Sequence, residues 1–508
     1  MTGLDPTFTS LPYRRLGDTA LARAAALGAT HADFRFERLR YQRLGVRDAV
    51  LQGAADREDL GFAVRVVHGG SWGFASGVVL TDDEAVRLAE TAVAVARVAA
   101  DMTPVAIELA EEPVYDDVTW VSDYEVNPLE VPTSEKAALL VEWTRRLREH
   151  HVVEHATASL QQVQENKYYA DLAGTRTTQQ RVRLQPEFEA MGSDAGTGAF
   201  DAMRSIAPPV ARGWEYLTGD QWDWDAELLA VPDLLAEKLK APSVQAGTYD
   251  LVVHPSNLWL TIHESIGHAT ELDRVLGYEA NYAGTSFATY DQLGTLRYGS
   301  PLMNVTGDRT YPHGLATTGY DDEGVQTQSW DIVRDGVLVG YQLDRAMGRM
   351  KPELSPNHPG GRSNGCAYAD SPGHIPIQRM ANVSLQPAPD GPGTEELIAG
   401  VERGLYVVGD KSWSIDMQRF NFQFTGQRFF MIEDGRLAGQ VRDAAYQATT
   451  TDFWGAMDAV GGPETWILGG AFNCGKAQPG QVAAVSHGCP TSRFRGVSIL
   501  NTVHEGGH

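Results

Sequence analysis

Residues 257–276 read NLWLTIHESIGHATELDRVL, and they lie near the point where the pattern of predicted secondary structure changes. The apolar residues of this stretch predict a buried helix with Ser256 as its cap. Before it, helical and strand patterns alternate; after it, the chain consists mostly of strands and turns rich in Gly, Asp and Pro. We therefore predict an α+β protein with two domains, residues 1–242 and residues 243–508.

The first domain is expected to be α+β. Apolar periodicity predicts one helix that ends near Gly28 and three more over residues 82–100, 134–150 and 220–239. Alternating residues predict strands at 32–36, 61–67 and 72–75. The second domain is expected to be dominated by antiparallel β-sheet or barrel-like structure, which carries the helix quoted above.

Two segments of the second domain share one pattern. Residues 333–346 read VRDGVLVGYQLDRA and residues 432–445 read IEDGRLAGQVRDAA. Asp-Gly between alternating residues predicts a tight β-hairpin in each, and the repetition hints at a duplicated β unit. The Pro- and Gly-rich residues 351–376 between them predict a long loop.

The bulk composition is that of a globular protein without a nucleic-acid partner. The 508 residues are 43% hydrophobic and 21% charged, with a net charge of −24 that would repel phosphate. Only three cysteines occur, which argues against a disulfide framework. Neither a signal peptide nor an apolar run of about 20 residues is visible. These features predict a cytoplasmic protein without a membrane partner.

The helix contains His263-Glu264-Ser265-Ile266-Gly267-His268, an H-E-x-x-x-H pattern. The usual zinc motif spaces its histidines by four, which places both on one helix face beside a glutamate base. A spacing of five separates the side chains by about 140° on a regular α-helix. A π-type turn would bring them back together, and Gly267 would ease that distortion. The pattern therefore predicts either a widened turn or no metal site.

A second match lies at the end of the chain. His504-Glu505-Gly506-Gly507-His508 fits the textual H-E-x-x-H pattern better than the helix does. The glycine pair breaks the helix that this spacing requires, and chain ends are usually frayed. We predict a surface tail there.

Two zinc-binding histidines need a third protein ligand and an open position. The residues alone leave four candidates open: Cys474, Cys489, Glu271 and Asp273. The same two acids could instead accept a hydrogen bond from the second nitrogen of a motif histidine.

The sequence resembles the TldD branch of the TldD/PmbA family of metallopeptidases. The resemblance spans nearly the whole chain and rests on five motifs: GFAVRVVHGGSWGFASG at 61–77, HESIGHATELD at 263–273, DDEGVQTQ at 321–328, IEDG at 432–435 and NCGK at 473–476. One departure follows the second histidine, where ATELDRVLGYEANYAG keeps the acids of typical members but not their glycine.

The resemblance implies a zinc site of His263, His268 and Cys474, with Glu264 activating water for the hydrolysis of peptide bonds. Because the PmbA (TldE) branch lacks the metal motif, its presence assigns this chain to the catalytic branch. The resemblance further implies a heterodimer with a TldE/PmbA-like subunit. That heterodimer would bind unfolded or leader-like peptides as an added strand.

Glu271, Asp273 and Asp322 are further candidates, as substrate-binding residues of the cleft. For Asp322 and its acidic neighbours, a solvated turn is an equal alternative. One rival function is a non-catalytic peptide-binding or modulator subunit, which would have no need of Glu264. Another is a cysteine hydrolase that pairs Cys474 with His487, although no local pattern places those two together.

Overall fold

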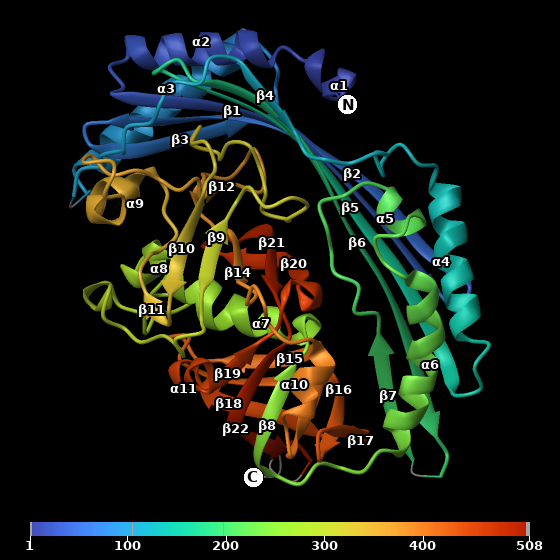
Figure 1. Ribbon diagram of the computed structural model, residues 1–508. Helices are drawn as coiled ribbons and strands as arrows, with labels where there is room; N and C mark the ends of the chain where they lie inside the picture. The colour runs from blue at the N-terminus through green and yellow to red at the C-terminus, as the bar shows by residue number, and fades with distance from the viewer. Residues whose placement is uncertain (1–2, 104, 197, 504–508) are drawn as a thin grey trace.

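The computed structural model describes residues 3–103, 105–196 and 198–503. It shows a long curved β-sheet with helices on its outer face and a second body of smaller sheets and a barrel on the other side (Figure 1). The predicted α+β class with a barrel-like C-terminal part is confirmed. The predicted division at residue 243 stays a prediction. The His504–His508 motif lies outside the described residues.

The large sheet has the strand order β3-β2-β1-β5-β6-β4, with β7 paired to β6. The predicted strand at 32–36 is only the start of a 17-residue strand, so the predicted length was wrong. The strands of the large sheet are β1 His31–Arg47, β2 Val50–His68, β3 Ser71–Gly77, β4 Val118–Val121, β5 Val153–Asp171, β6 Arg176–Asp194 and β7 Ala199–Arg204.

Two separate groups of helices cover the two ends of this sheet (Figure 1). Strand β1 contributes Phe34 and Phe36 to the first apolar core, and Leu44 and Val46 to the second. The predicted helices form within a few residues of their expected ends. They are α2 Tyr13–Ala26, α3 Asp82–Ala100, α4 Thr133–Leu147 and α6 Trp224–Lys240, while the short helices α1 Pro6–Thr9 and α5 Glu215–Thr218 were not predicted.

The C-terminal part contains a barrel. Strands follow the order β15-β8-β22-β18-β16-β17, and an additional pairing of β15 with β16 closes five of them into a ring. The strands are β8 Gly247–Val253, β15 Arg403–Ile415, β16 Asn421–Glu433, β17 Arg436–Val441, β18 Ala444–Thr449, β19 Met457–Val460 and β22 Ser492–Asn501. Helices α10 Thr394–Ala399 and α11 Thr450–Gly455 accompany them.

Smaller sheets lie between the barrel and the large sheet (Figure 1). One is β11-β10-β9-β14, and the others are the pairs β12-β13 and β20-β21. Their bounds are β9 Val305–Asp308, β10 Ser329–Arg334, β11 Val337–Leu338, β12 Ala367–Tyr368, β13 Ile377–Gln378, β14 Asn382–Leu385, β20 Ile467–Lys476 and β21 Gln481–Cys489. The remaining helices here are α7 Pro255–Ile262, α8 Leu272–Val275 and α9 Arg345–Met350.

Both predicted Asp-Gly hairpins form. Asp335-Gly336 and Asp434-Gly435 all have positive φ angles, which this two-residue turn requires. The first hairpin joins β10 to β11 and the second joins β16 to β17, so they belong to different sheets. The repeated pattern therefore reflects shared turn chemistry and not a shared place in the fold. The predicted loop 351–376 is mostly irregular but contains β12.

The acidic turn at 321–323 is buried, so the alternative of a solvated turn is wrong. All three side chains are buried against the large sheet. Asp322 accepts from Lys167 Nζ at 2.6 Å, and Glu323 accepts from Arg65 at 2.9 Å. The turn therefore joins the C-terminal part to the sheet through buried ion pairs.

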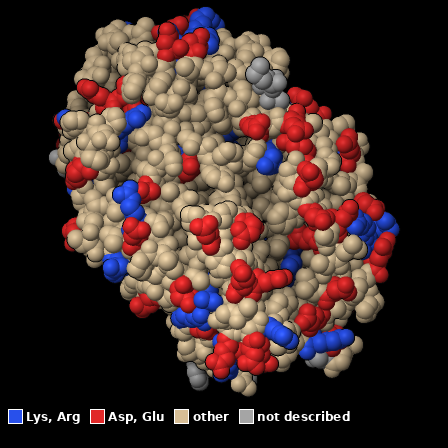
Figure 2. Space-filling view, in the orientation of Figure 1, with Lys and Arg blue, Asp and Glu red and all other residues tan. Residues whose placement is uncertain are grey.

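Acidic side chains outnumber basic ones on the face shown in Figure 2, in keeping with the net charge of −24. Within the described ranges, the helices include none of the length and apolar character needed to cross a membrane.

Candidate metal centre

Helix α7 starts directly after barrel strand β8. Pro255 occupies the first helical position, where its missing N–H costs no hydrogen bond. The predicted cap, Ser256, is wrong by two residues, since His254 is the N-cap and its Nδ1 accepts from the Ser256 backbone N–H. The Ser256 hydroxyl instead accepts from the Gly409 backbone N–H and so ties the helix to strand β15.

The widened turn predicted from the spacing of five is confirmed. Residues His263–Gly267 form a π-helical turn, in which the His268 N–H donates to the His263 carbonyl. The two imidazole rings consequently lie on one side of the helix, with centroids 4.7 Å apart. A spacing of five does not fit a regular α-helical zinc motif, but the π-helical turn brings the two rings together in spite of it.

The displaced carbonyls of this turn find other partners. The Ser265 carbonyl accepts from the Tyr298 hydroxyl, and the Gly267 carbonyl accepts from the Gln342 amide at 2.7 Å. Gly267 also has no room for a side chain, since an added Cβ would lie 2.5 Å from the sulfur of Met380. Surrounding packing therefore stabilises a turn that would otherwise leave buried carbonyls unpaired.

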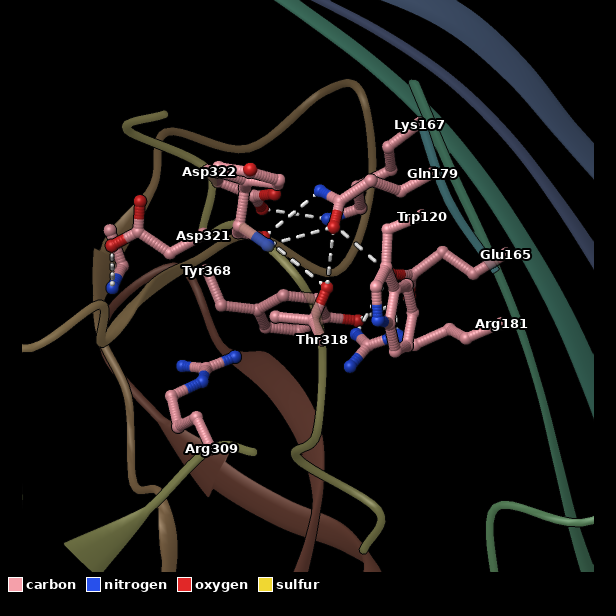
Figure 3. Close-up of a pocket in the computed structure, with 12 residues that line it drawn as sticks. Trp120, Glu165, Lys167, Gln179, Arg181, Arg309, Thr318, Asp321, Asp322 and Tyr368 are labelled. Atoms are coloured by element: carbon pink, nitrogen blue, oxygen red, sulfur yellow. Dashed lines mark hydrogen bonds and ion pairs between the residues drawn. The ribbon is translucent and has the colours of Figure 1, made fainter. Parts of the chain in front are cut away.

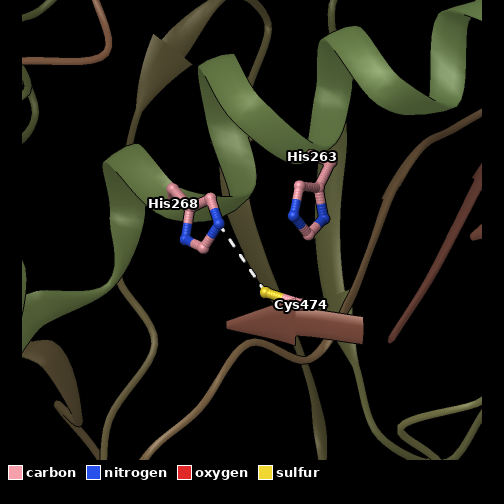
Figure 4. Close-up of side chains that lie close together, drawn as sticks. All are labelled: His263, His268 and Cys474. Carbon is pink, nitrogen blue, oxygen red and sulfur yellow. Dashed lines mark hydrogen bonds between the residues drawn. The ribbon is translucent and has the colours of Figure 1, made fainter. Parts of the chain in front are cut away.

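Strand β20 brings the cysteine to the helix. Ligand atoms of His263, His268 and Cys474 lie within 4.8 Å of one another, and all three side chains are buried (Figure 4). Cys474 stands where the register of β20 with β21 shifts, and its Sγ is 3.6 Å from His268 Nε2. The other C-terminal candidate, Cys489, lies against the Pro255 carbonyl at the start of the helix.

An acid orients the second histidine. His268 Nδ1 is 2.9 Å from Glu271 Oε2, so the nitrogen donates and Nε2 keeps its lone pair toward Cys474. Glu271 is fully buried, and Lys476 Nζ lies 3.2 Å from its other oxygen. Burial alone would raise the pKa of Glu271, but the charge of Lys476 and the hydrogen bond from His268 outweigh it and lower the pKa well below its usual value.

A third histidine orients the first. His487 Nδ1 lies 2.8 Å from the Val383 carbonyl, which can only accept, so that nitrogen carries the proton. Burial lowers the pKa of His487 well below its usual value and keeps the ring neutral. Its Nε2 therefore accepts from His263 Nδ1 at 2.8 Å. As a result His263 Nε2 also retains a lone pair.

The electrostatics of the cluster favour deprotonated donors. Burial lowers the pKa of His263, so its imidazole is neutral. Burial raises the pKa of the Cys474 thiol, but its contact with His268 and the charge of Arg379 outweigh this and lower the pKa overall. Neutral imidazoles and a thiolate are the forms that bind metal.

Glu264 faces a cleft beside these donors. Its carboxylate accepts from Arg419 Nη1 at 2.9 Å. Burial alone would raise the pKa of Glu264, but the neighbouring imidazoles of His268 and His263 and the charge of Arg419 keep it below the usual value. The cleft holds about 510 Å³ and is also lined by Trp413. Its far wall comes from Gln185, Glu187 and residues 204–209 of the N-terminal half.

The remaining predicted residues lie elsewhere. Asp273 accepts from Lys476 Nζ at 2.8 Å beside Glu271, beneath the helix, and Asp322 lies against Lys167 of the large sheet. Their predicted substrate-binding role stays a prediction. Sequence reasoning did not find the contact of His487 with His263. Its only signal was a histidine in the apolar run AAVSHGC at 483–489.

Two imidazole nitrogens and one thiol around a common point, with a carboxylate alongside, are the donor set of a metal-dependent hydrolase. Family models described as the PmbA/TldA metallopeptidase C-terminal domain and domain 1 match residues 246–501 and 32–96. The chain belongs to this PmbA/TldD metallopeptidase family.

Relatives match over most of their length. A metalloprotease of Methanothermobacter thermautotrophicus is 27% identical over 93% of this chain and 96% of its own. The metalloprotease TldD homolog of Haemophilus influenzae is 24% identical over 93% of each chain. The zinc metalloprotease TldD homolog of Saccharolobus solfataricus is 22% identical over 94% of this chain and 98% of its own.

Solved structures share the fold. A putative modulator of DNA gyrase from Thermotoga maritima superposes with a TM-score of 0.74 at 14% identity, covering 96% of this chain and 100% of the other. TldE from Thermococcus kodakarensis superposes with a TM-score of 0.69 at 15% identity, covering 95% and 99%.

Proposed function

We propose that this chain is a zinc-dependent peptidase in which His263, His268 and Cys474 hold the metal and Glu264 is the general base. The observation that carries the proposal is the convergence of three buried donors whose outer partners leave both Nε2 lone pairs free. A histidine that merely fills a core has no need of such a converging arrangement.

The donor set suits zinc. Borderline-soft Zn²⁺ takes imidazole nitrogen and thiolate sulfur in four-coordinate sites, and three protein ligands leave one position for water. When bound, zinc would polarise the scissile carbonyl and lower the pKa of that water. A relative named zinc metalloprotease is consistent with this choice.

Glu264 follows the first donor directly in sequence and faces the cleft. Its depressed pKa keeps it ionised at neutral pH, so that it can take a proton from water and pass it to the leaving amine. Arg419 holds one carboxylate oxygen and leaves the other for this proton transfer.

The cleft suits an extended peptide. Strand β20 pairs with β21 alone among the described strands, so its second edge is available for backbone hydrogen bonds. Its residues Gly469, Gly470 and Ala471 line the cleft beside the donors. A peptide that adds a strand there is held mainly by its main chain, which favours unfolded or leader-like substrates of varied sequence.

A TldE/PmbA-like subunit is the proposed partner, in a heterodimer. Support comes from the likeness in fold to TldE, although that likeness bears on the fold alone. The competing function is a non-catalytic peptide-binding or modulator subunit. The position of Glu264 at the cleft, beside three donors, favours the peptidase, because peptide binding needs neither a base nor a metal site.

Zinc analysis of purified variants tests the metal site. We expect one zinc per wild-type chain, retained in Glu264→Gln and lost in Cys474→Ala. Cys489→Ala is the matched control, since it removes a buried thiol away from the donors and should keep its zinc. Stoichiometric zinc in Cys474→Ala would exclude this cysteine from the site.

Hydrolysis of an unstructured peptide tests the activity, with and without a TldE-like subunit and a chelator. We expect cleavage by the wild type, abolished by chelator and by Glu264→Gln. Absence of cleavage in every combination, with zinc bound, would instead favour the binding subunit. Cleavage that resists chelator but not a thiol reagent would favour a cysteine hydrolase.

A further inference from the structure

A cavity between the large sheet and strand β21 is lined by three arginines. Arg181 comes from β6, Arg309 follows β9, and Arg379 precedes β14. The cavity is small: the space open to the centre of a water molecule is about 10 Å³, which is room for one small ion or molecule. The other lining residues are Ala316, Tyr368, Met380, Ala483 and Ala484, so no acid faces the cavity among the residues described.

Arg309 is the least satisfied of the three. Its side chain is buried, with a relative exposure of 2%, and both Nε and Nη1 lack a hydrogen-bond partner within the described part of the chain. Figure 3 shows its guanidinium beside the ring of Tyr368 without an interaction to the residues drawn. The neighbouring Cys366 thiol offers no charge, because burial raises its pKa to about 12.

The nearby acids are already engaged. Glu165 pairs with Arg181 at 2.7 Å and also with Arg183. Asp321 lines the adjoining cavity with Arg309, but its oxygens accept from backbone N–H groups, including that of Ala367 at 3.0 Å. Neither acid forms an ion pair with Arg309 in the described structure.

Arg379 adds a second cation without an acid. Its Nη atoms donate to the backbone carbonyls of Cys474 and Gln481, while its Nε lacks a partner among the described atoms. Carbonyls satisfy N–H groups but do not neutralise the charge. Arginine stays protonated in proteins, and a buried charge without a counter-charge is costly.

We propose that this cavity binds a small monovalent anion of the halide class, chloride in the cell, between Arg309 and Arg379. Water would satisfy the free N–H groups but leave both charges uncompensated. Sulfate and phosphate exceed the available room. The ion would lie between Arg181 of the large sheet and Arg379. Arg379 in turn donates to the backbone carbonyl of Cys474.

Bromide provides a direct test, since it substitutes for chloride and scatters anomalously. Crystals of the wild-type protein grown with bromide as the sole halide should show an anomalous peak within hydrogen-bonding distance of Arg309. Only a water peak there would overturn the proposal, and this measurement depends on no variant.

Thermal unfolding at constant ionic strength provides the second test. Replacing gluconate, which is too large for the cavity, by 100 mM chloride or bromide should raise the apparent melting temperature of the wild type by about 2 °C, as a ligand of the folded state does. Arg309→Met should lose this halide effect. The matched control is Arg334→Met, an exposed arginine paired with Asp331, which should keep it. Equal melting temperatures in halide and gluconate for the wild type, or a full halide effect in Arg309→Met, would refute the anion site.

Discussion

Replacing His487 by phenylalanine should weaken zinc binding without abolishing the fold. The substituted ring keeps the near-parallel stacking on Trp259, where the ring centroids are 6.3 Å apart. It cannot accept the proton of His263 Nδ1, which now lies 2.8 Å from His487 Nε2. The His263 ring then loses the hydrogen bond that fixes both its orientation and its tautomer.

The magnitude follows from the role of such outer partners. Their loss typically costs 10–100-fold in metal affinity, or about 1.4–2.7 kcal/mol. The Val383 carbonyl also loses its donor, at a cost of about 1 kcal/mol in stability. We therefore expect the zinc dissociation constant of His487→Phe to rise by about 10–100-fold in a chelator competition assay.

His254→Phe is the matched control. His254 is partly buried beside an aromatic ring, that of Tyr406, and its loss removes the cap of helix α7. It should lower stability by about 1 kcal/mol and leave zinc affinity within about threefold of the wild type. Zinc affinity of His487→Phe within threefold of the wild type, or an equal loss in His254→Phe, would refute the orienting role.

Three further perturbations test the surroundings. Gly267→Ala should destabilise the fold by about 1–3 kcal/mol in thermal unfolding, because its methyl group would meet Met380. Lys476→Met should cost about 3–5 kcal/mol, measured by denaturant unfolding, because buried Asp273 loses its ion-pair partner and buried Glu271 loses one of its two cationic neighbours. Burial alone would raise the pKa of Asp33, but Arg65 lowers it to about 2, so its contribution to stability is present above pH 4 and is lost between about pH 4 and 2. Asp33→Asn should remove that part of the pH dependence of unfolding.

Local chemistry made the helical segment around His263 predictable. Five-residue spacing of His263 and His268 leaves few geometric solutions, and a glycine between them favours a π turn, which the structure contains. Turn residues likewise predicted both Asp-Gly hairpins. In these cases the deciding interactions lie within a few residues of one another, so a pattern in the sequence records them.

Long-range pairing made the rest unpredictable. Strand β1 extends to Arg47 through FERLRYQRLGVR, whose charges are typical of a solvated segment. Glu37 and Arg38 are nonetheless buried, because partners on other strands compensate them. The contact of His487 with His263 joins residues 224 positions apart. No spacing rule reports such a contact, since it exists only once β21 packs beside the helix.

The two halves of the molecule are joined by charge more than by apolar packing. Each described core cluster draws its buried residues from one side of residue 243 only. Between the halves lie the buried pairs Lys167–Asp322 and Arg65–Glu323. If the two halves separated, water would solvate these charges well. Burying them therefore stabilises the contact little, and the stability of the contact depends on each charge having its partner. The cleft beside Glu264 has walls from both halves, so its shape depends on how the sheet is docked.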